Sequence, residues 1–418
     1  MHTVTSKKAE AAKFDTLFIV DSLFINETYP SHYLNRLEPL TLLSAVAVHT
    51  QYLGLVGTLT TTYNSPFNLA RRFASLDHIS NGRAGWNVVT SFDVGAAKNF
   101  GLDKHLDYAT RYDRALEHVR VVQGLWDSYE DDAFPADVER DVFLDPSKLH
   151  ALNHRGPHFS VEGPLNLSRS RQGQPVIFQS GQSEEGRNLA AHIAEGIYAA
   201  PGAFAERQAY YADIKQRAQR LGRNPDHVLI FLGANPVVAD SDAAALQLAR
   251  DVFESDNDFA RKLGQFGRSF GAYDFSQHDL DAPFPDVSDL AERGGRTNAQ
   301  KIIDQARAQR LTLRETVLQF TQFQPSPFIG SPATVAREIE RWFEQRALDG
   351  LNLGFRTSQE LDQFTGEVLP ILRAKGLVRE DYTSETLRGH LGLPIPDNRY
   401  TARAQSEAPE DTDAAAAQ

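Results

Sequence analysis

The 418-residue chain contains no cysteine, and its only methionine is Met1. The absence of cysteine excludes disulfides, thiolate metal sites and cysteine nucleophiles. Long hydrophobic runs are also missing, because no stretch approaches the roughly 18 apolar residues of a membrane span. The first segment, MHTVTSKKAEAAKF, lacks the apolar centre of a secretory signal. We therefore expect a soluble, cytoplasmic protein with no membrane partner.

Positive charge is in short supply, since 43 Lys and Arg against 55 Asp and Glu leave a net charge of −12. Nucleic-acid binding requires a cationic face that neutralises phosphates, so this balance argues against a nucleic-acid partner. The hydrophobic share of 41% is ordinary for a globular protein. The composition indicates a small-molecule partner.

Short apolar runs alternate with amphipathic helical patterns along most of the chain, which predicts an α/β fold with a parallel sheet. Strand-like runs lie at 15–23, 52–63, 84–91, 174–180, 196–200, 227–239 and 350–355. Helical patterns lie at 37–50, 65–80, 112–126, from 183, and at 204–222, 331–345 and 359–376. No glycine-rich dinucleotide motif follows the first strand, and polar residues recur at strand ends. Both observations favour a TIM-type (β/α)8 barrel.

Two segments interrupt this alternation. Residues 127–173 are polar and rich in turns, and residues 250–330 are aromatic and contain Gly and Pro, which predicts a lid or binding loop. We interpret both as insertions in one barrel domain at 1–400. The end of the chain, 401–418, is predicted to be disordered.

The stretch QPVIFQSGQSEEGRNLAAHIAEG, at 174–196, combines a strand, a tight turn and a helix start. The N–H groups at a helix N-terminus attract anions, so residues 181–185 would hold a phosphate, aided by Ser183 and Arg187. Alternatively, Ser183 is an ordinary helix cap. The G-x-S-x-G motif of serine hydrolases is absent, because Glu185 stands where its second glycine is required.

Two pairs of adjacent polar residues each have two interpretations. Arg111 and Tyr112, at a predicted helix start, would close round an anion, or are a surface arginine and a half-buried tyrosine. Asp77 and His78 end a predicted helix, where we expect them to tie down the Asn-Gly turn at 81–82 rather than to catalyse.

Three histidines in the first insertion, at 150, 154 and 158, have the spacing of metal ligands on a helix. Gly156 and Pro157 break that helix, and no carboxylate stands between the first two histidines as in H-E-x-x-H. We expect contacts within the insertion and no metal site.

Several motifs together resemble one known family. They are TLTTTYNSPFNLARRFASLDHISNGRAGWNVVTS at 58–91, AAKNFG at 96–101 and RYD at 111–113. These resemble the bacterial luciferase-like flavin monooxygenases, in the branch with nitrilotriacetate, dibenzothiophene-sulfone and long-chain alkane monooxygenases. The similarity continues through PVIFQSGQSEEGR, GSPATVAREI and DGLNLGF, so that it covers about residues 10–400.

The resemblance implies a TIM barrel that binds reduced FMN at the carboxyl ends of its strands. Asn87 would then pair with the flavin edge, which would offset the cost of burying an amide, while Trp86 packs outward against helices. The alternative is that Asn87 bonds a neighbouring backbone group. By motif, the implied flavin contacts are Asp21, Thr58, Asn87, Ser91, Arg111, Tyr112, Ser180, Gly181, Gln182 and Ser183.

The resemblance further implies a two-component monooxygenase. Reduced FMN would come from a separate NAD(P)H:flavin reductase, O2 would supply one oxygen atom to a small organic substrate, and the phenylalanines of 250–330 would line the substrate space. A homodimer is expected, and no residue is assigned a catalytic role. Relatives in this family have an additional strand before the first one found here, so we expect the barrel to lack its first strand. The alternative is therefore a truncated, non-catalytic or uncoupled flavin-binding protein.

Overall fold

The computed structural model describes residues 2–26, 29, 31–91, 93–255, 258–271, 273–293 and 296–402. Apart from its first two residues, the predicted disordered tail at 401–418 lies outside this part of the chain.

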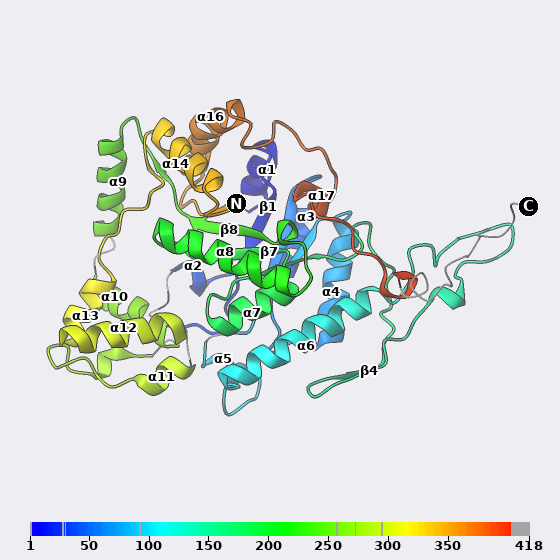
Figure 1. Ribbon diagram of the computed structural model, residues 1–418, viewed down its shortest axis with the longest axis horizontal. Coiled ribbons are helices and arrows are strands. Elements are labelled where there is room, and N and C mark those ends of the chain that lie inside the picture. The colour runs from blue at the N-terminus through cyan, green and yellow to red at the C-terminus, as the bar shows by residue number, and fades with distance from the viewer. Residues whose placement is uncertain are drawn as a thin grey trace, which may run out of the picture.

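Seven parallel strands form a nearly closed barrel with helices around it (Figure 1), which confirms the TIM-type prediction. In spatial order they are β1 (Thr16–Ile19), β2 (Gly54–Thr60), β3 (Ala84–Val89), β6 (Val176–Gln179), β7 (Gly196–Ala199), β8 (Leu229–Ala234) and β11 (Gly350–Leu353). Each corresponds to a predicted strand. The predicted run at 227–239 is split, because its end forms β9 (Val237–Val238), which pairs with β10 (Ile329–Gly330) in a separate small sheet.

The barrel is open between β1 and β11. Within the described residues neither strand has a partner on its outer side, and all four residues of each are only half-buried. A cavity of about 160 Å³ lies between them, lined by side chains that include Leu17, Phe18, Leu351 and Leu353. This edge leaves backbone hydrogen-bonding groups without strand partners.

The helices that follow the strands cover the outside of the barrel (Figure 1). Serines stand at the starts of three of these helices. Within the described residues, the side chains of Ser65 and Ser331 make no capping bond, whereas that of Ser183 does. The helices outside the second insertion are α1 (His2–Ala11), α2 (Ser31–Leu34), α3 (Pro39–Ala47), α4 (Pro66–Ile79), α5 (Ala96–Asn99), α6 (Tyr108–Trp126), α7 (Glu184–Ile193), α8 (Phe204–Arg220), α14 (Pro332–Glu344), α15 (Ser358–Gln363), α16 (Leu369–Ala374) and α17 (Leu387–His390).

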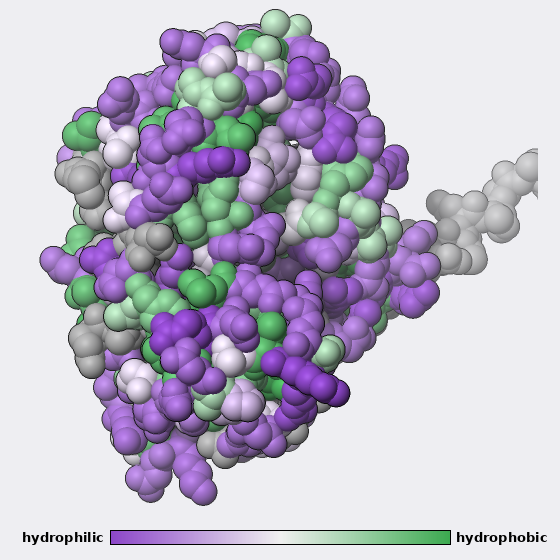
Figure 2. Space-filling view, turned by 90° about the vertical axis from the view of Figure 1, so that its left-hand side faces the viewer, coloured by the Kyte–Doolittle hydropathy of each residue, from purple (hydrophilic) through white to green (hydrophobic). Residues whose placement is uncertain are grey.

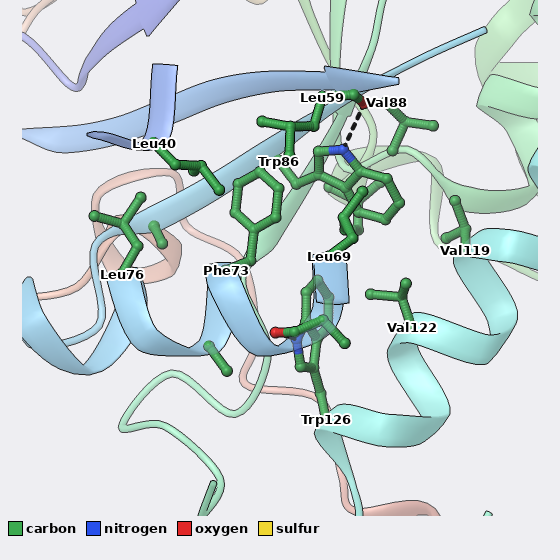
Figure 3. Packing of buried hydrophobic residues seen from close by; sticks show 14 of the residues in the cluster. Leu40, Leu59, Leu69, Phe73, Leu76, Trp86, Val88, Val119, Val122 and Trp126 are labelled. Atoms are coloured by element: carbon green, nitrogen blue, oxygen red, sulfur yellow. Dashed lines mark hydrogen bonds between the residues drawn. The ribbon is translucent and has the colours of Figure 1, made fainter. Parts of the chain in front are cut away.

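Trp86 anchors the packing between β3 and the helices, as predicted (Figure 3). Its ring is fully buried, lies 5.7 Å from the ring of Phe73 on α4 and 6.4 Å from that of Trp126 on α6, and donates a hydrogen bond to the carbonyl of Leu59. Successive strand residues point to opposite faces, so Asn87 points into the barrel.

The two insertions differ in structure. Residues 127–173 are mostly turns, with the short strands β4 (His154–Arg155) and β5 (Ser160–Val161). The second insertion is helical rather than a loop and has its own core, in which Phe266, Phe270 and Phe275 pack together. The expectation that its phenylalanines line a substrate space is wrong for these three, which are at most 3% exposed. Its helices are α9 (Asp242–Ser255), α10 (Phe259–Gly267), α11 (Ser288–Arg293), α12 (Arg296–Gln309) and α13 (Leu313–Phe320).

A C-terminal segment closes the amino end of the barrel, which sequence patterns did not predict. Leu387 of α17 packs with Val56 and Phe178 inside the barrel. Arg388, which is 2% exposed, donates to both carboxylate oxygens of Glu195 and to the carbonyl of Gln174. The opposite, carboxyl end of the barrel therefore remains for a ligand.

Candidate functional site

A cavity of about 390 Å³ lies at the carboxyl ends of β1, β2, β3, β6 and β7. It collects eight of the ten predicted site residues from segments far apart in the sequence. They are Asp21, Thr58, Asn87, Ser91, Tyr112, Ser180, Gly181 and Gln182. The other two adjoin the lining, since Arg111 donates to the carbonyl of Ser91 and Ser183 directly follows Gln182 in the chain.

The floor of the cavity carries two buried amides. Asn87, 2% exposed, donates from Nδ2 to Oγ1 of Thr58 over 2.9 Å, so it bonds a side chain and not the backbone group of the alternative interpretation. Among the described residues, its Oδ1 atom has no hydrogen-bond partner, and neither does Oε1 of Gln179, which is 3% exposed. Buried acceptors without donors are costly, so this floor is suited to a ligand that supplies N–H or O–H groups.

Ser91 shapes one wall in a strained conformation. Its φ of 50° is in the left-handed region, which a residue with a side chain rarely adopts. Its hydroxyl donates to Oγ1 of Thr60 over 2.8 Å, and its carbonyl accepts from Arg111 and lies 3.1 Å from Nε2 of His105. Arg111 is 2% exposed and also bonds the carbonyl of Thr90, so the surface-arginine interpretation is wrong.

His105 is neutral in this arrangement. Burial and the neighbouring Arg111 lower its pKa to about 4. Because the carbonyl of Ser91 can only accept, Nε2 carries the proton and Nδ1 accepts from the hydroxyl of Tyr63 over 2.6 Å. A partly buried chain of hydrogen bonds from Tyr63 thus supports the strained turn at Ser91.

The turn at residues 180–183 ends β6 and begins α7 (Glu184–Ile193). Ser183 is the helix cap, since its hydroxyl accepts from the N–H of Gly186 over 3.1 Å and from the hydroxyl of Tyr108. A side chain on Gly181 or on Gly186 would meet backbone atoms of the other within 2.9 Å, so the turn and the helix touch through their backbones. Side-chain capping is confirmed for Ser183, while the first N–H groups of α7 have no intrahelical acceptors.

Two carboxyl groups line the same cavity. Burial raises the pKa of Asp21, after β1, to about 6. Asp93, which the sequence analysis missed, accepts from Tyr29 over 2.6 Å and from Ser22 over 2.9 Å, and burial raises its pKa as well. The guanidinium of Arg268 lies 5.2 Å from the ring of Tyr29, so the second insertion contacts this part of the rim.

Other sequence candidates lie outside the cavity. Asp77 ties down the turn before β3, as predicted, because its carboxylate accepts from the N–H of Ala84 over 2.8 Å and from Gln172 over 2.7 Å. His154 bonds Glu117 and His150 bonds Glu130, each over 2.8 Å. Among the residues that the structure describes, no group of three metal-ligating side chains is placed to hold an ion.

Four residues at or beside the cavity were not among the predicted flavin contacts, and they differ in whether a sequence pattern indicated them. Gln179 belongs to the polar residues at strand ends that favoured a barrel, but it was not among the predicted flavin contacts. Tyr198 and Asp93 line the cavity from β7 and from the loop after β3, but their immediate sequence carries no such signal. His105 acts through contacts with Tyr63 and Ser91 that only the fold brings together.

The helices of the second insertion lie beside the carboxyl end of the barrel (Figure 1). Residues of α12 and the start of α7 line a second, open hollow, with Ser183 on one side and Lys301 on the other. The face of the molecule that carries this insertion is mostly hydrophilic, with hydrophobic side chains gathered in patches (Figure 2). Within the described residues no helix combines the length and apolar character needed to cross a bilayer.

Comparisons with known proteins agree with this geometry. Residues 4–349 match the family model described as luciferase-like monooxygenase. The chain is 41% identical to an N-acetyl-S-(2-succino)cysteine monooxygenase of Bacillus subtilis, over 94% of this chain and 90% of that protein. It is 39% identical to nitrilotriacetate monooxygenase component A of Aminobacter aminovorans, over 94% of this chain and 89% of that protein.

Solved structures give the same answer at the level of the fold. A long-chain alkane monooxygenase has a TM-score of 0.80 and 32% identity, over 96% of this chain and 91% of that one. A riboflavin lyase, solved with a modified FMN and riboflavin, has a TM-score of 0.82 and 30% identity, over 94% of this chain and 89% of that one.

Proposed function

The chain belongs to the luciferase-like monooxygenase family, and from this we propose that it is the oxygenating component of an FMN-dependent two-component monooxygenase. A separate reductase would supply reduced FMN. When bound, reduced FMN supplies two electrons to O2, so that one oxygen atom enters a small organic substrate, the other leaves as water, and FMN is released in its oxidised form.

The observation that carries this proposal is the 390 Å³ cavity with two buried acceptors, Oδ1 of Asn87 and Oε1 of Gln179, that have no hydrogen-bond donor in the described part of the chain. An isoalloxazine ring has N–H groups on one edge, and a ribityl chain has hydroxyl groups, so FMN provides the donors that these acceptors lack. Residues of this chain therefore fit the ligand that the family implies.

The turn at 180–183 fits the other end of the same ligand. It presents the N-terminus of α7, where N–H groups and the helix dipole favour a phosphate. Because Gly181 and Gly186 have no side chains, the backbone of the turn packs directly on the first turn of α7 and fixes the turn beside the free N–H groups of that helix. Ser180, Gly181 and Gln182 would contact the phosphate, and Ser183 would hold the helix start in place.

The remaining residues would orient the ligand and exclude water. Thr58 holds the amide of Asn87, and the hydrogen bonds of Ser91 and Arg111 fix the wall of the cavity. Asp21 and Asp93 lie on the side that contacts the second insertion, where burial raises the pKa of each carboxyl. A buried carboxyl with a raised pKa can hold a proton near the substrate. Exclusion of water at this rim would prevent side reactions, so that the electrons supplied by reduced FMN are used for oxygenation of the substrate.

A direct assay tests the proposal. The purified chain is titrated with FMN, then supplied with an NAD(P)H:flavin reductase, ¹⁸O2 and a panel of thioethers, amino-polycarboxylates and sulfones, and products are analysed by mass spectrometry. Incorporation of one ¹⁸O atom into a substrate supports the proposal. Flavin binding with release of hydrogen peroxide alone, across the panel, would favour the alternative of an uncoupled flavin-binding protein.

A matched pair of variants tests the phosphate position. Ser183→Asp places a negative charge at the start of α7 and should weaken FMN binding about tenfold or more, because like charges repel at short range. Ser65→Asp makes the same change at the exposed cap of α4, which is not one of the residues that line the cavity, and should leave FMN binding unchanged. Equal FMN affinity in both variants would remove the assignment of the phosphate to this turn.

A further inference from the structure

Two arginines from different helices hold Gln182 from behind the cavity. Arg187 of α7 donates from Nε to the carbonyl of Gln182 over 3.0 Å. Arg207 of α8 donates from Nη1 to the side-chain oxygen of Gln182 over 2.8 Å and to the carbonyl of Ala200 over 3.2 Å. The backbone and the side chain of this turn residue are thus fixed independently.

The two guanidinium groups also share one aromatic ring. Tyr210, 2% exposed, has Arg187 at 5.1 Å and Arg207 at 5.3 Å from the centre of its ring. Cation–π contacts of this kind attract a guanidinium to the face of an aromatic ring. The guanidinium of Arg207 is therefore fixed in position by α8 as well as by Gln182.

The charge of Arg207 is not matched by an ion pair in the described structure. Arg187 is paired with Asp213 over 2.9 Å, and Arg217 is paired with Asp213 and Glu184. Arg207 forms no such pair, and its Nε is buried without a hydrogen-bond partner. The acidic group that acts on Arg207 electrostatically is the exposed Glu206 beside it on α8, and the first turn of α7 carries Glu184 and Glu185. A guanidinium stays protonated in proteins, so Arg207 brings a positive charge to this turn.

We propose that Arg207 is a positioning residue that makes the turn at 180–183 selective for a phosphorylated flavin over an unphosphorylated one. Arg207 acts first through Gln182, because it orients the side chain of Gln182 at the cavity. It acts second through its unpaired positive charge, which offsets the negative charges of the acidic residues of α7 where a phosphate would lie. The inference rests on the proposed function and goes beyond it, since it assigns the discrimination between FMN and riboflavin to one residue outside the cavity.

The test compares the affinities of the full chain for FMN and for riboflavin, measured by quenching of flavin fluorescence. Arg207→Gln should raise the dissociation constant for FMN about tenfold and that for riboflavin less than about twofold, because only FMN carries the phosphate. Arg207→Lys keeps the charge but not the planar fork, and should recover part of the FMN affinity.

A matched control is available on the same helix. Arg220→Gln removes the same charge from an exposed position 13 residues further along α8, roughly 20 Å away, and should change neither affinity. Equal weakening of FMN and riboflavin by Arg207→Gln would mean a structural role and would overturn the inference, as would no change for either ligand. If the unmodified chain fails to bind FMN, the proposed function fails instead, which separates the two results.

Discussion

The two sides of the barrel differ in burial. In the closed half, formed by β2, β3 and β6, nearly every residue is buried, whereas all residues of β1 and β11, the open half, are only half-buried. Among the predicted residues that line the cavity, Asp21 alone follows a strand of the open half. A site needs side chains held by rigid surroundings, and the closed half provides them.

The largest expected difference between the halves is in stability. Leu55 on β2 and Leu17 on β1 face each other in register, but Leu55 is fully buried and Leu17 is not. Leu55→Ala should lower the free energy of unfolding by about 3 kcal/mol, because it leaves a void in a packed core. Leu17→Ala should lower it by about 1 kcal/mol. Urea unfolding followed by circular dichroism measures both, and equal losses would contradict the comparison.

Burial in the closed half also predicts a pH dependence. Asp77 is fully buried, and burial raises its pKa from 3.8 to about 6. The folded chain therefore holds this proton more tightly than the unfolded chain, so stability is lost as pH rises from about 4 to about 6, by up to about 3 kcal/mol. Asp77→Asn cannot titrate and should lack this loss. Urea unfolding at several pH values compares the two proteins, and parallel stability curves would exclude the effect.

A smaller effect is expected at the rim of the closed half. If His105 supports Ser91, His105→Ala should raise the dissociation constant for FMN about fivefold, because the carbonyl of the strained residue loses a donor. The variant His105→Gln should regain most of the affinity for FMN, because a glutamine side chain has both a hydrogen-bond donor and an acceptor. Fluorescence titration measures this, and equal weakening in the two variants would show that the imidazole ring is needed for another reason.

Much of the fold follows from local sequence. All seven strands of the sheet were predicted, because each is a short apolar run that ends in a polar residue or a turn. The position of the cavity followed from the same rule, since parallel strands bring their carboxyl ends together. The orientation of Trp86 and Asn87 to opposite faces followed from the two-residue period of a strand.

The parts that could not be predicted depend on contacts between distant segments. Arg111 has the sequence context of an exposed helix start, yet it is buried because its guanidinium satisfies the carbonyls of Thr90 and Ser91. Arg388 closes the amino end of the barrel through Glu195, which is 193 residues away. The second insertion has its own aromatic core, and its Gly and Pro content predicted loops where helices form.

The contact between Gly181 and Gly186 has a consequence for engineering this protein. Since a methyl group at either position would collide with backbone, libraries that aim to change the accepted substrate should leave both glycines untouched. Diversity is better introduced at rim positions such as Leu23 and Tyr33, which line the cavity from outside the sheet. Laboratory evolution of new substrate specificities would then change the rim of the cavity and leave the Gly181–Gly186 contact intact.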